Sequence, residues 1–161
     1  MSLDLRIGVG VDVHRLAPDR PCMVGGVEIP SDVGPLGHSD GDAVLHALCD
    51  AVLGAAGLDD LGSLFPNDAA VNKDRPSADF CTEALRQIQS KGLRVISLDV
   101  VLETEQPRLI PYRDAIRTRI AELFAVDRDR VNLKGKSGEK VGPIGRSEAM
   151  RATAVALLAG S

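Results

Sequence analysis

The side chains of this 161-residue sequence best suited to chemistry are one aspartate and two histidines. Asp12 and His14 stand two positions apart in a run of alternating apolar and other residues, so on a β-strand both would point to one side, about 7 Å apart. His46 follows the segment His38-Ser39-Asp40-Gly41-Asp42 in an Ala/Leu-rich stretch. Carboxylate and imidazole donors suit zinc, and three protein ligands leave a fourth position for water or a substrate oxygen. We therefore expect a catalytic metal site.

Each of these residues also has an ordinary structural interpretation. An aspartate near a strand end often caps a loop, and a histidine in an apolar helix is often a satisfied core residue. The D-x-H spacing of Asp12 and His14 is a weak signal alone. Its occurrence together with H-S-D-G-D-x-x-x-H favours the metal site, because a segment preceding a buried helix has no evident structural need for so many polar groups.

Composition limits the class of protein. With 44% hydrophobic residues the chain can fill one core, and we expect a single domain over residues 1–161. The net charge is −4 and no basic stripe is present, so we expect no nucleic-acid partner. No signal peptide is visible and no apolar run reaches the ~20 residues that span a bilayer, which predicts a cytoplasmic protein with no membrane partner. Three cysteines without a C-x-x-C pair favour buried, reduced thiols.

Hydrophobic periodicity predicts the elements that position these residues. Expected strands are residues 5–14, 23–29 with a turn at Gly25-Gly26, 93–103 and 131–134. Expected helices run from Ser39 or Asp40 to about Gly57, from Ser77 or Asp79 to Gly92, from Pro111 onward, and from Ala149 to Leu158. Ser31 to Gly37 and residues 58–76 read as loops. The interleaved order indicates an α+β fold: a single-domain α/β sandwich with one mixed sheet and helices on one face.

Ten different short motifs follow one another along nearly the whole chain. They are Gly10–His14, Gly25-Gly26-Val27, His38–Asp42, Leu45-His46-Ala47-Leu48, Asp60-Leu61-Gly62, Phe65-Pro66, Pro107-Arg108-Leu109, Val131–Lys134, Glu139–Gly142 and Gly145-Arg146. Together they resemble the 2-C-methyl-D-erythritol 2,4-cyclodiphosphate synthase family. That resemblance implies cyclisation of 4-diphosphocytidyl-2-C-methyl-D-erythritol 2-phosphate, with release of CMP, in non-mevalonate isoprenoid precursor synthesis.

The resemblance also implies roles for individual residues. Asp12, His14 and His46 would hold Zn²⁺, and Glu139 would help hold Mg²⁺ or Mn²⁺ between the substrate phosphates. His38 and Ser137 would stabilise the transition state. The implied substrate contacts are Asp12, Val13, His14, His38, Ser39, Asp60, Leu61, Gly62, Phe65, Pro66, Asn67, Asp68, Ala69, Thr104, Glu105, Gln106, Pro107, Arg108, Leu109, Ile110, Lys136, Ser137, Gly138, Glu139, Pro143 and Arg146.

Similar proteins are homotrimers with active sites between subunits, so the resemblance implies the same assembly here. Arg146 would face an apolar cavity on the threefold axis, or else solvent beside the last element. Two positions depart from the family pattern. Ser137 stands where Thr is frequent, which keeps the hydroxyl, and Pro143 stands where an aromatic residue is common, which puts ligand binding in the axial cavity in doubt.

Other interpretations are less well supported. Gly135-Lys136-Ser137 ends like a phosphate-binding loop, but Arg130 replaces the required glycine. Gly8-Val9-Gly10 lacks the third glycine of a dinucleotide fingerprint, and Glu103 with Glu105 reads as a solvated pair. The remaining alternatives are a zinc-dependent phosphohydrolase and a non-catalytic trimer that binds isoprenoid diphosphates.

Overall fold

One mixed sheet organises the chain, as a computed structural model describing residues 4–37, 39–66 and 75–160 shows. Its strand order is β4-β1-β7-β5-β6. The strands are β1 (Leu5–Pro18), β4 (Val33–Pro35), β5 (Leu93–Glu103), β6 (Val131–Lys136) and β7 (Ala149–Gly160). Among the strands of the described residues, β5 and β6 pair in parallel and the other pairs of this sheet are antiparallel. A separate hairpin joins β2 (Cys22–Val24) to β3 (Val27–Ile29).

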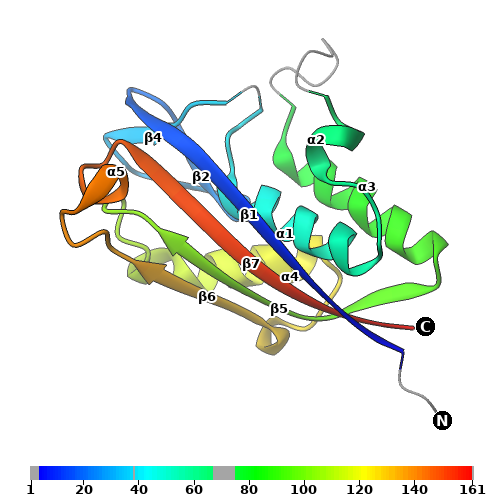
Figure 1. Ribbon diagram of the computed structural model, residues 1–161. Helices are drawn as coiled ribbons and strands as arrows, with labels where there is room; N and C mark the ends of the chain where they lie inside the picture. The colour runs from blue at the N-terminus through cyan, green and yellow to red at the C-terminus, as the bar shows by residue number, and fades with distance from the viewer. Residues whose placement is uncertain (1–3, 38, 67–74, 161) are drawn as a thin grey trace.

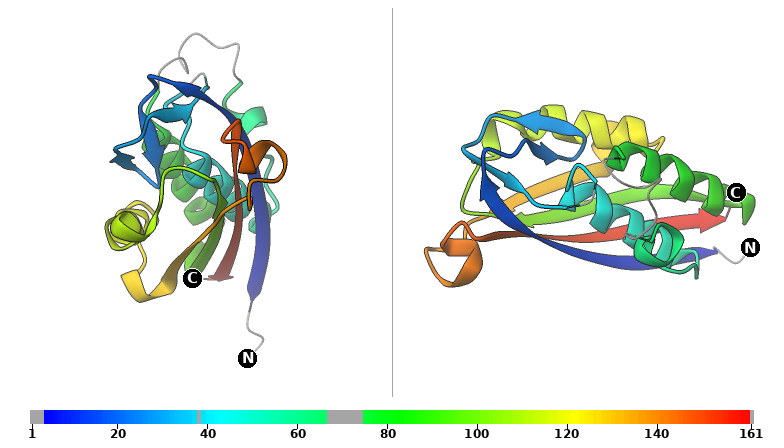
Figure 2. Two further views of the ribbon diagram at one scale, coloured as in Figure 1. Left: turned by 90° about the vertical axis from the view of Figure 1, so that its left-hand side faces the viewer. Right: turned by 90° about the horizontal axis from the view of Figure 1, so that it is seen from above.

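Helices cover one face of this sheet. The helices of the described residues are α1 (Ala43–Ala55), α2 (Leu61–Leu64), α3 (Ser77–Ser90), α4 (Arg113–Leu123) and α5 (Gly142–Gly145), with 3₁₀ turns at Ile110–Tyr112 and Arg128–Arg130. In Figures 1 and 2, α1, α3 and α4 lie on the same side of the sheet, and the short α5 lies at one end of it. The predicted α+β arrangement with a mixed sheet is confirmed. Within the described residues no helix has the length and apolar character needed to cross a membrane.

The predicted helix from Ala149 to Leu158 is wrong. This segment is strand β7, which lies in the middle of the sheet between β1 and β5. Burial alternates along it, and Ala152, Ala154 and Ala156 face inward. Alanine has high helix propensity but low strand propensity, so local composition favoured a helix. Hydrogen bonding of β7 to β1 and β5 on its two sides, and packing against the helices, outweigh that local preference.

Several other boundaries also differ from the prediction. The loop predicted at residues 31–37 contains strand β4, and the stretch 58–76 contains helix α2. Residues 23–29 form two strands joined at Gly25-Gly26. Helix α1 begins after Asp42, not after Ser39 or Asp40, and α4 begins at Arg113, after a 3₁₀ turn. These elements are short or lie at helix ends, where local patterns locate boundaries least well.

Small residues allow α1 to lie unusually close to the sheet. Gly8 and Gly10 on β1 pair with Ala156 and Ala154 on β7. A β-carbon built on Gly10 would lie 1.9 Å from the backbone oxygen of Ala47. At Gly8 and Gly10 the inward face of β1 carries no side chain, so α1 packs directly on the strand backbone. This close packing brings the next inward-facing residues of β1 near the first turns of α1.

The opposite face of β1 is apolar and exposed in the single chain. Ile7, Val9, Val11 and Val13 are 72%, 62%, 44% and 56% exposed. The strand alternation thus separates the two faces as predicted. An apolar row this exposed is typical of a surface that another protein chain covers.

Candidate active site

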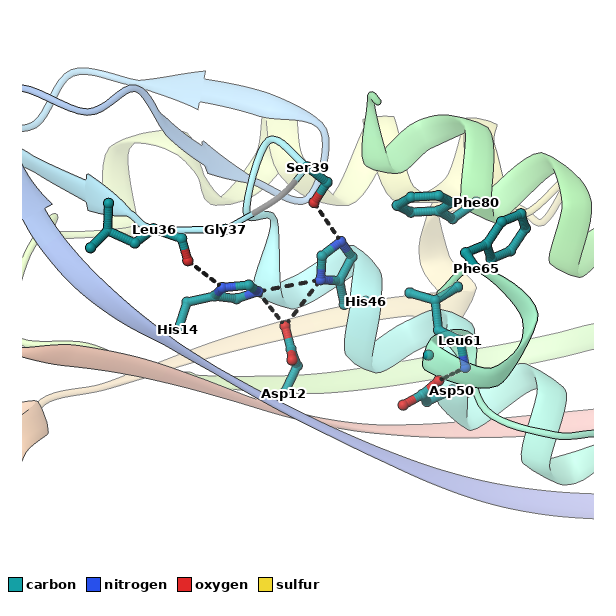
Figure 3. Close-up of a pocket in the computed structure, with 11 residues that line it drawn as sticks. Asp12, His14, Leu36, Gly37, Ser39, His46, Asp50, Leu61, Phe65 and Phe80 are labelled. Atoms are coloured by element: carbon teal, nitrogen blue, oxygen red, sulfur yellow. Dashed lines mark hydrogen bonds and ion pairs between the residues drawn. The ribbon is translucent and has the colours of Figure 1, made fainter. Parts of the chain in front are cut away.

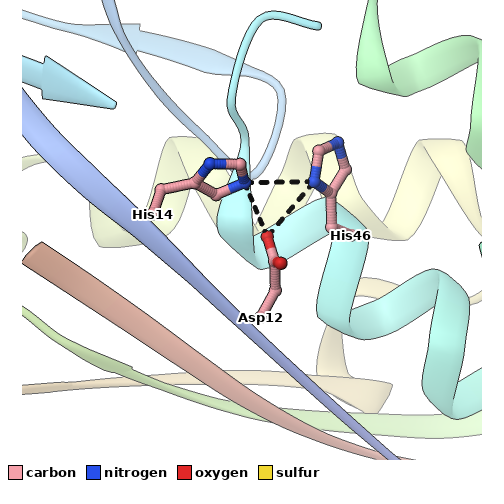
Figure 4. Close-up of side chains that lie close together, drawn as sticks. All are labelled: Asp12, His14 and His46. Atoms are coloured by element: carbon pink, nitrogen blue, oxygen red, sulfur yellow. Dashed lines mark hydrogen bonds and ion pairs between the residues drawn. The ribbon is translucent and has the colours of Figure 1, made fainter. Parts of the chain in front are cut away.

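Three donor atoms converge where β1 passes beneath the start of α1. Asp12 Oδ2 lies 2.8 Å from His14 Nε2 and 3.2 Å from His46 Nδ1, and the two nitrogens are 3.3 Å apart (Figure 4). Asp12 and His14 share a face of β1 because they are two residues apart. His46 reaches them from α1. The structure therefore brings together the three ligands predicted from sequence.

The charges of the three side chains in this cluster are coupled to one another. Burial raises the pKa of Asp12, but hydrogen bonds and charge from His14 and His46 outweigh it and hold that pKa well below its usual range. Burial lowers the pKa of His14, yet the hydrogen bond and charge of Asp12 leave it raised overall. His14 Nδ1 donates to the Leu36 carbonyl at 2.9 Å, which turns Nε2 toward the cluster.

The donor set suits zinc. One carboxylate oxygen and two imidazole nitrogens, each half-buried, match the three-ligand sites in which zinc keeps one open position. The hydrogen bond from His14 to a backbone carbonyl is the partner that a ligating imidazole usually has on its other nitrogen. These residues therefore fit a catalytic zinc ion.

The cluster forms one wall of a cavity of about 320 Å³ (Figure 3). The other lining residues are Leu36, Gly37, Ser39, Asp50, Leu61, Gly62, Phe65 and Phe80. Ser39, Leu61, Gly62 and Phe65 were predicted as substrate contacts, and the structure places all four here. Leu36, Gly37, Asp50 and Phe80 were missed. Phe80 reads from sequence as part of a buried helical stripe, so only the packing of α3 against α1 reveals its place.

In the polar segment before α1, Asp42 stabilises the fold. Asp42 is fully buried, caps α1 by accepting from Leu45 N at 3.0 Å, and accepts from Gly25 N and Gly26 N at 2.9 and 2.7 Å. Gly25 and Gly26 both have positive φ, which lets the turn aim two N–H groups at one carboxylate. Asp42 thus ties the β2-β3 turn to α1. His38 lies outside the described residues.

The loop after α1 supplies the far wall of the cavity. Asp60 caps α2 by accepting from Ser63 N at 2.8 Å, and hydrogen bonds from Ser63 lower its pKa. Leu61 N donates to Asp50 Oδ1 at 2.7 Å, which holds the start of α2 against α1. Pro66 follows Phe65 and is exposed. The predicted contacts Asn67, Asp68 and Ala69 lie outside the described residues.

A second cavity, of about 630 Å³, lies between the end of β5 and the end of β6. Of the predicted residues, Thr104, Glu105, Pro107, Arg108, Leu109, Ile110, Lys136 and Ser137 line it, together with Arg113, Leu133, Lys134 and Gly135. Gln106 and Gly138 are not lining residues, but both shape the wall. Thr104 Oγ1 donates to the Gln106 carbonyl, and Gly138 N donates to Glu105 Oε2 at 3.0 Å.

Glu139 stands at the rim of this second cavity. Its Oε1 accepts from the Ser137 hydroxyl at 2.9 Å, and it is exposed with a positive φ of 49°. Within the described residues the two cavities share no lining residue. The cluster of Asp12, His14 and His46 and the residue Ser137, to which Glu139 is hydrogen-bonded, therefore belong to separate cavities in one chain.

Val13 and Pro143 line a third cavity, which lies where β7 begins beside β1. Arg146 is exposed beside it and forms an ion pair with Glu148, Nε to Oε1, at 2.9 Å. Val13 points away from Asp12 and His14, so it does not line their cavity.

The fold and the two cavities together define a class: a small α+β enzyme with a cluster of one aspartate and two histidines that could hold a metal ion, and with a second, separate cavity. The sequence profile of the YgbB family matches residues 5–159, and the chain belongs to this family.

Comparison with individual proteins agrees. A 2-C-methyl-D-erythritol 2,4-cyclodiphosphate synthase of Chromobacterium violaceum is 49% identical over 96% of this chain and 98% of its own. A 2C-methyl-D-erythritol-2,4-cyclodiphosphate synthase solved in a CDP-bound form has a TM-score of 0.88, with 40% identity over 95% of this chain and 99% of that one. The bifunctional IspDF protein of Campylobacter jejuni has a TM-score of 0.95 and 34% identity over 99% of this chain, which spans 43% of that larger protein.

Proposed function

We propose that this chain is a 2-C-methyl-D-erythritol 2,4-cyclodiphosphate synthase. It would convert 4-diphosphocytidyl-2-C-methyl-D-erythritol 2-phosphate to the cyclic 2,4-diphosphate and CMP. The observation that carries the proposal is the convergence of Asp12, His14 and His46 in a chain that matches the family from residue 5 to 159. In the reaction an oxygen of the 2-phosphate forms a bond to the β-phosphorus, and the bond from that phosphorus to the oxygen of CMP breaks.

The chain supplies position and charge for this transfer, since phosphoryl transfer needs little covalent help from a protein. Asp12, His14 and His46 would hold zinc, and Glu139 would help hold magnesium or manganese; these ions would neutralise phosphate charge and polarise the β-phosphate. Ser39 lines the same cavity and would donate to a phosphate oxygen.

Two walls would hold the two ends of the substrate. Asp60, Leu61 and Gly62, at the start of α2, would bind the methylerythritol hydroxyls. Thr104–Ile110 and Lys136–Glu139 would bind the cytidine, and the 630 Å³ cavity that most of these residues line supports this assignment. A relative of the same fold was solved with CDP bound. We assign transition-state stabilisation to His38 and to Ser137, whose hydroxyl already lies at the cavity.

We propose a homotrimer with each active site between two subunits. Two observations support it: the exposed apolar row from Ile7 to Val13, and the separation of the metal cluster from Ser137 and Glu139 in one chain. A neighbouring subunit packed on the open face of the sheet would cover the row and could bring its own nucleotide pocket to the cluster. Arg146 and Pro143 would then lie toward the axis. Three buried free thiols agree with the cytoplasmic location that we propose.

His46→Ala tests this function directly. Loss of one of three ligands should reduce CMP release to background while the fold and oligomeric state persist. The matched control is Thr82→Ala, which removes an exposed α3 hydroxyl bonded only to the Ala78 carbonyl among the described contacts. Release of CMP at the wild-type rate by His46→Ala would contradict the metal assignment, and hydrolysis without a cyclic product would favour the phosphohydrolase.

A further inference from the structure

The imidazole of His46 also has a hydrogen-bond partner at Nε2, the ring nitrogen that faces away from Asp12 and His14. Its Nε2 lies 2.8 Å from the hydroxyl oxygen of Ser77, the first residue of α3. Ser77 is fully buried. Asp40 accepts from both groups of Ser77: from its N–H at 3.0 Å and, through its other oxygen, from its hydroxyl. A continuous chain of hydrogen bonds thus runs from the cluster through His46 and Ser77 to Asp40.

The direction of every hydrogen bond in this chain follows from simple proton counting. His46 Nδ1 faces Asp12 Oδ2 and His14 Nε2, so it must be unprotonated to bind a metal. A neutral imidazole then carries its proton on Nε2, which donates to Ser77 Oγ. The Ser77 hydroxyl must in turn donate onward, and the acceptor within reach is the Asp40 carboxylate, which can only accept when ionised.

Ser39 is a weaker candidate for the same task. Its hydroxyl oxygen lies 3.2 Å from His46 Nε2 (Figure 3), farther than that of Ser77, and accepts from Gly41 N at 3.3 Å. It also lines the cavity, where its hydroxyl would donate to a substrate phosphate. Ser77 is fully buried and belongs to a different element, α3.

We propose that Ser77 and Asp40 are positioning residues for the metal ligand His46. They fix the tautomer in which Nε2 carries the proton, and they set the ring plane so that Nδ1 points at the metal. The inference rests on the proposed zinc site and extends it to two residues that contact neither metal nor substrate. Partners of this kind typically change metal affinity 10–100-fold when they are removed. His14 has the equivalent support from the Leu36 carbonyl, so side-chain substitution can test only the His46 support.

The test compares zinc affinity in Ser77→Ala, Asp40→Asn and the control Thr82→Ala by competition with a chromophoric chelator. Ser77→Ala removes one hydroxyl and should raise the zinc dissociation constant about 10–100-fold. Asp40→Asn keeps the shape but replaces a carboxylate acceptor by an amide, so it should raise the constant by a smaller factor. Thr82→Ala should bind zinc as the wild type does. Circular dichroism and urea unfolding of the zinc-free proteins check that each variant folds.

A second readout separates positioning from a general loss of structure. In the zinc-bound wild type, the His46 Nε2 proton should give an imidazole N–H signal that exchanges slowly with water, because Ser77 accepts it. Ser77→Ala should accelerate that exchange, and Thr82→Ala should not.

Each outcome has a distinct meaning. Equal zinc affinity and equal exchange in Ser77→Ala and wild type would overturn the positioning role while leaving the metal site intact. Failure of the wild type itself to bind zinc would overturn the proposed metal site together with it. If Ser77→Ala does not fold, Asp40→Asn decides the question, and wild-type affinity in that variant would overturn the proposal.

Discussion

Replacing Gly10 by alanine should separate α1 from β1 and disable the metal cluster. A β-carbon at Gly10 would lie 1.9 Å from Ala47 O and 2.7 Å from Ala51 N, whereas real β-carbons essentially never come within 3.0 Å of such atoms. Both contacts are with helix backbone, so no rotamer change can relieve them. The helix must move away from the strand by about 1.1 Å to restore an allowed contact.

This movement has two measurable costs. Overpacking of a tight core costs roughly 1–3 kcal/mol, occasionally more, and the backbone clash places Gly10→Ala at the upper end. The smaller conformational entropy of the unfolded alanine variant offsets about 0.4–1 kcal/mol, so we expect a net loss of about 2 kcal/mol or more. Ala47 follows His46 directly, and metal-ligand distances tolerate only about 0.2 Å. Zinc affinity should therefore fall at least about tenfold.

The assay is urea unfolding of the zinc-free protein, followed by zinc competition. Gly54→Ala is the matched control, because Gly54 lies on the same helix and its new β-carbon would have Val9 O as nearest neighbour, at 4.0 Å. The control should be neutral or slightly stabilising, by up to about 0.5–1 kcal/mol from helix propensity. If Gly10→Ala matches the control in both unfolding free energy and zinc affinity, the close-contact argument is refuted.

Three further predictions test other parts of the structure. Asp42→Ala leaves the backbone N–H groups of Gly25, Gly26 and Leu45 without their acceptor. Urea unfolding should show a loss of about 2–4 kcal/mol in the free energy of unfolding, and a loss under about 1 kcal/mol would contradict the role of Asp42 in joining the β2-β3 turn to α1. Burial raises the pKa of Cys22 to about 11. At a pH above the pKa of the unfolded thiol, the unfolded chain loses this proton while the folded protein keeps it. The free energy of unfolding should therefore fall as pH rises from about 9 to 11, and it should fall less in Cys22→Ala. An equal pH dependence of stability in the two proteins would contradict the raised pKa of Cys22. Val9→Lys places a charge in the exposed apolar row, so ultracentrifugation should show dissociation of the proposed trimer, and an intact trimer would contradict that interface.

The first half of the metal site could be predicted from sequence because it depends on local geometry alone. Two residues that are two apart on a strand share a face whatever the rest of the fold does. That reasoning placed Asp12 beside His14. The structure brings His46, the third predicted ligand, to this pair. Its approach depends on the close contact of α1 with Gly8 and Gly10, which no local pattern reports.

The misassigned last element shows the limit of local propensity. The Ala-rich segment from Ala149 to Leu158 has the composition of a helix, yet its buried residues alternate with a period of two. Ala152, Ala154 and Ala156 are fully buried there, where β7 lies against α1. Ser77 was not recognised as part of the site for a different reason, since it meets His46 across a sequence separation of 31 residues.

The most direct test of the central claim is phosphorus NMR of the protein with 4-diphosphocytidyl-2-C-methyl-D-erythritol 2-phosphate. With zinc and magnesium present, the substrate signals should give way to those of a cyclic diphosphate and of CMP in equal amounts. A chelator should stop the conversion, and added zinc and magnesium should restore it. Unchanged substrate with both metals present, or linear hydrolysis products without the cyclic diphosphate, would contradict the account.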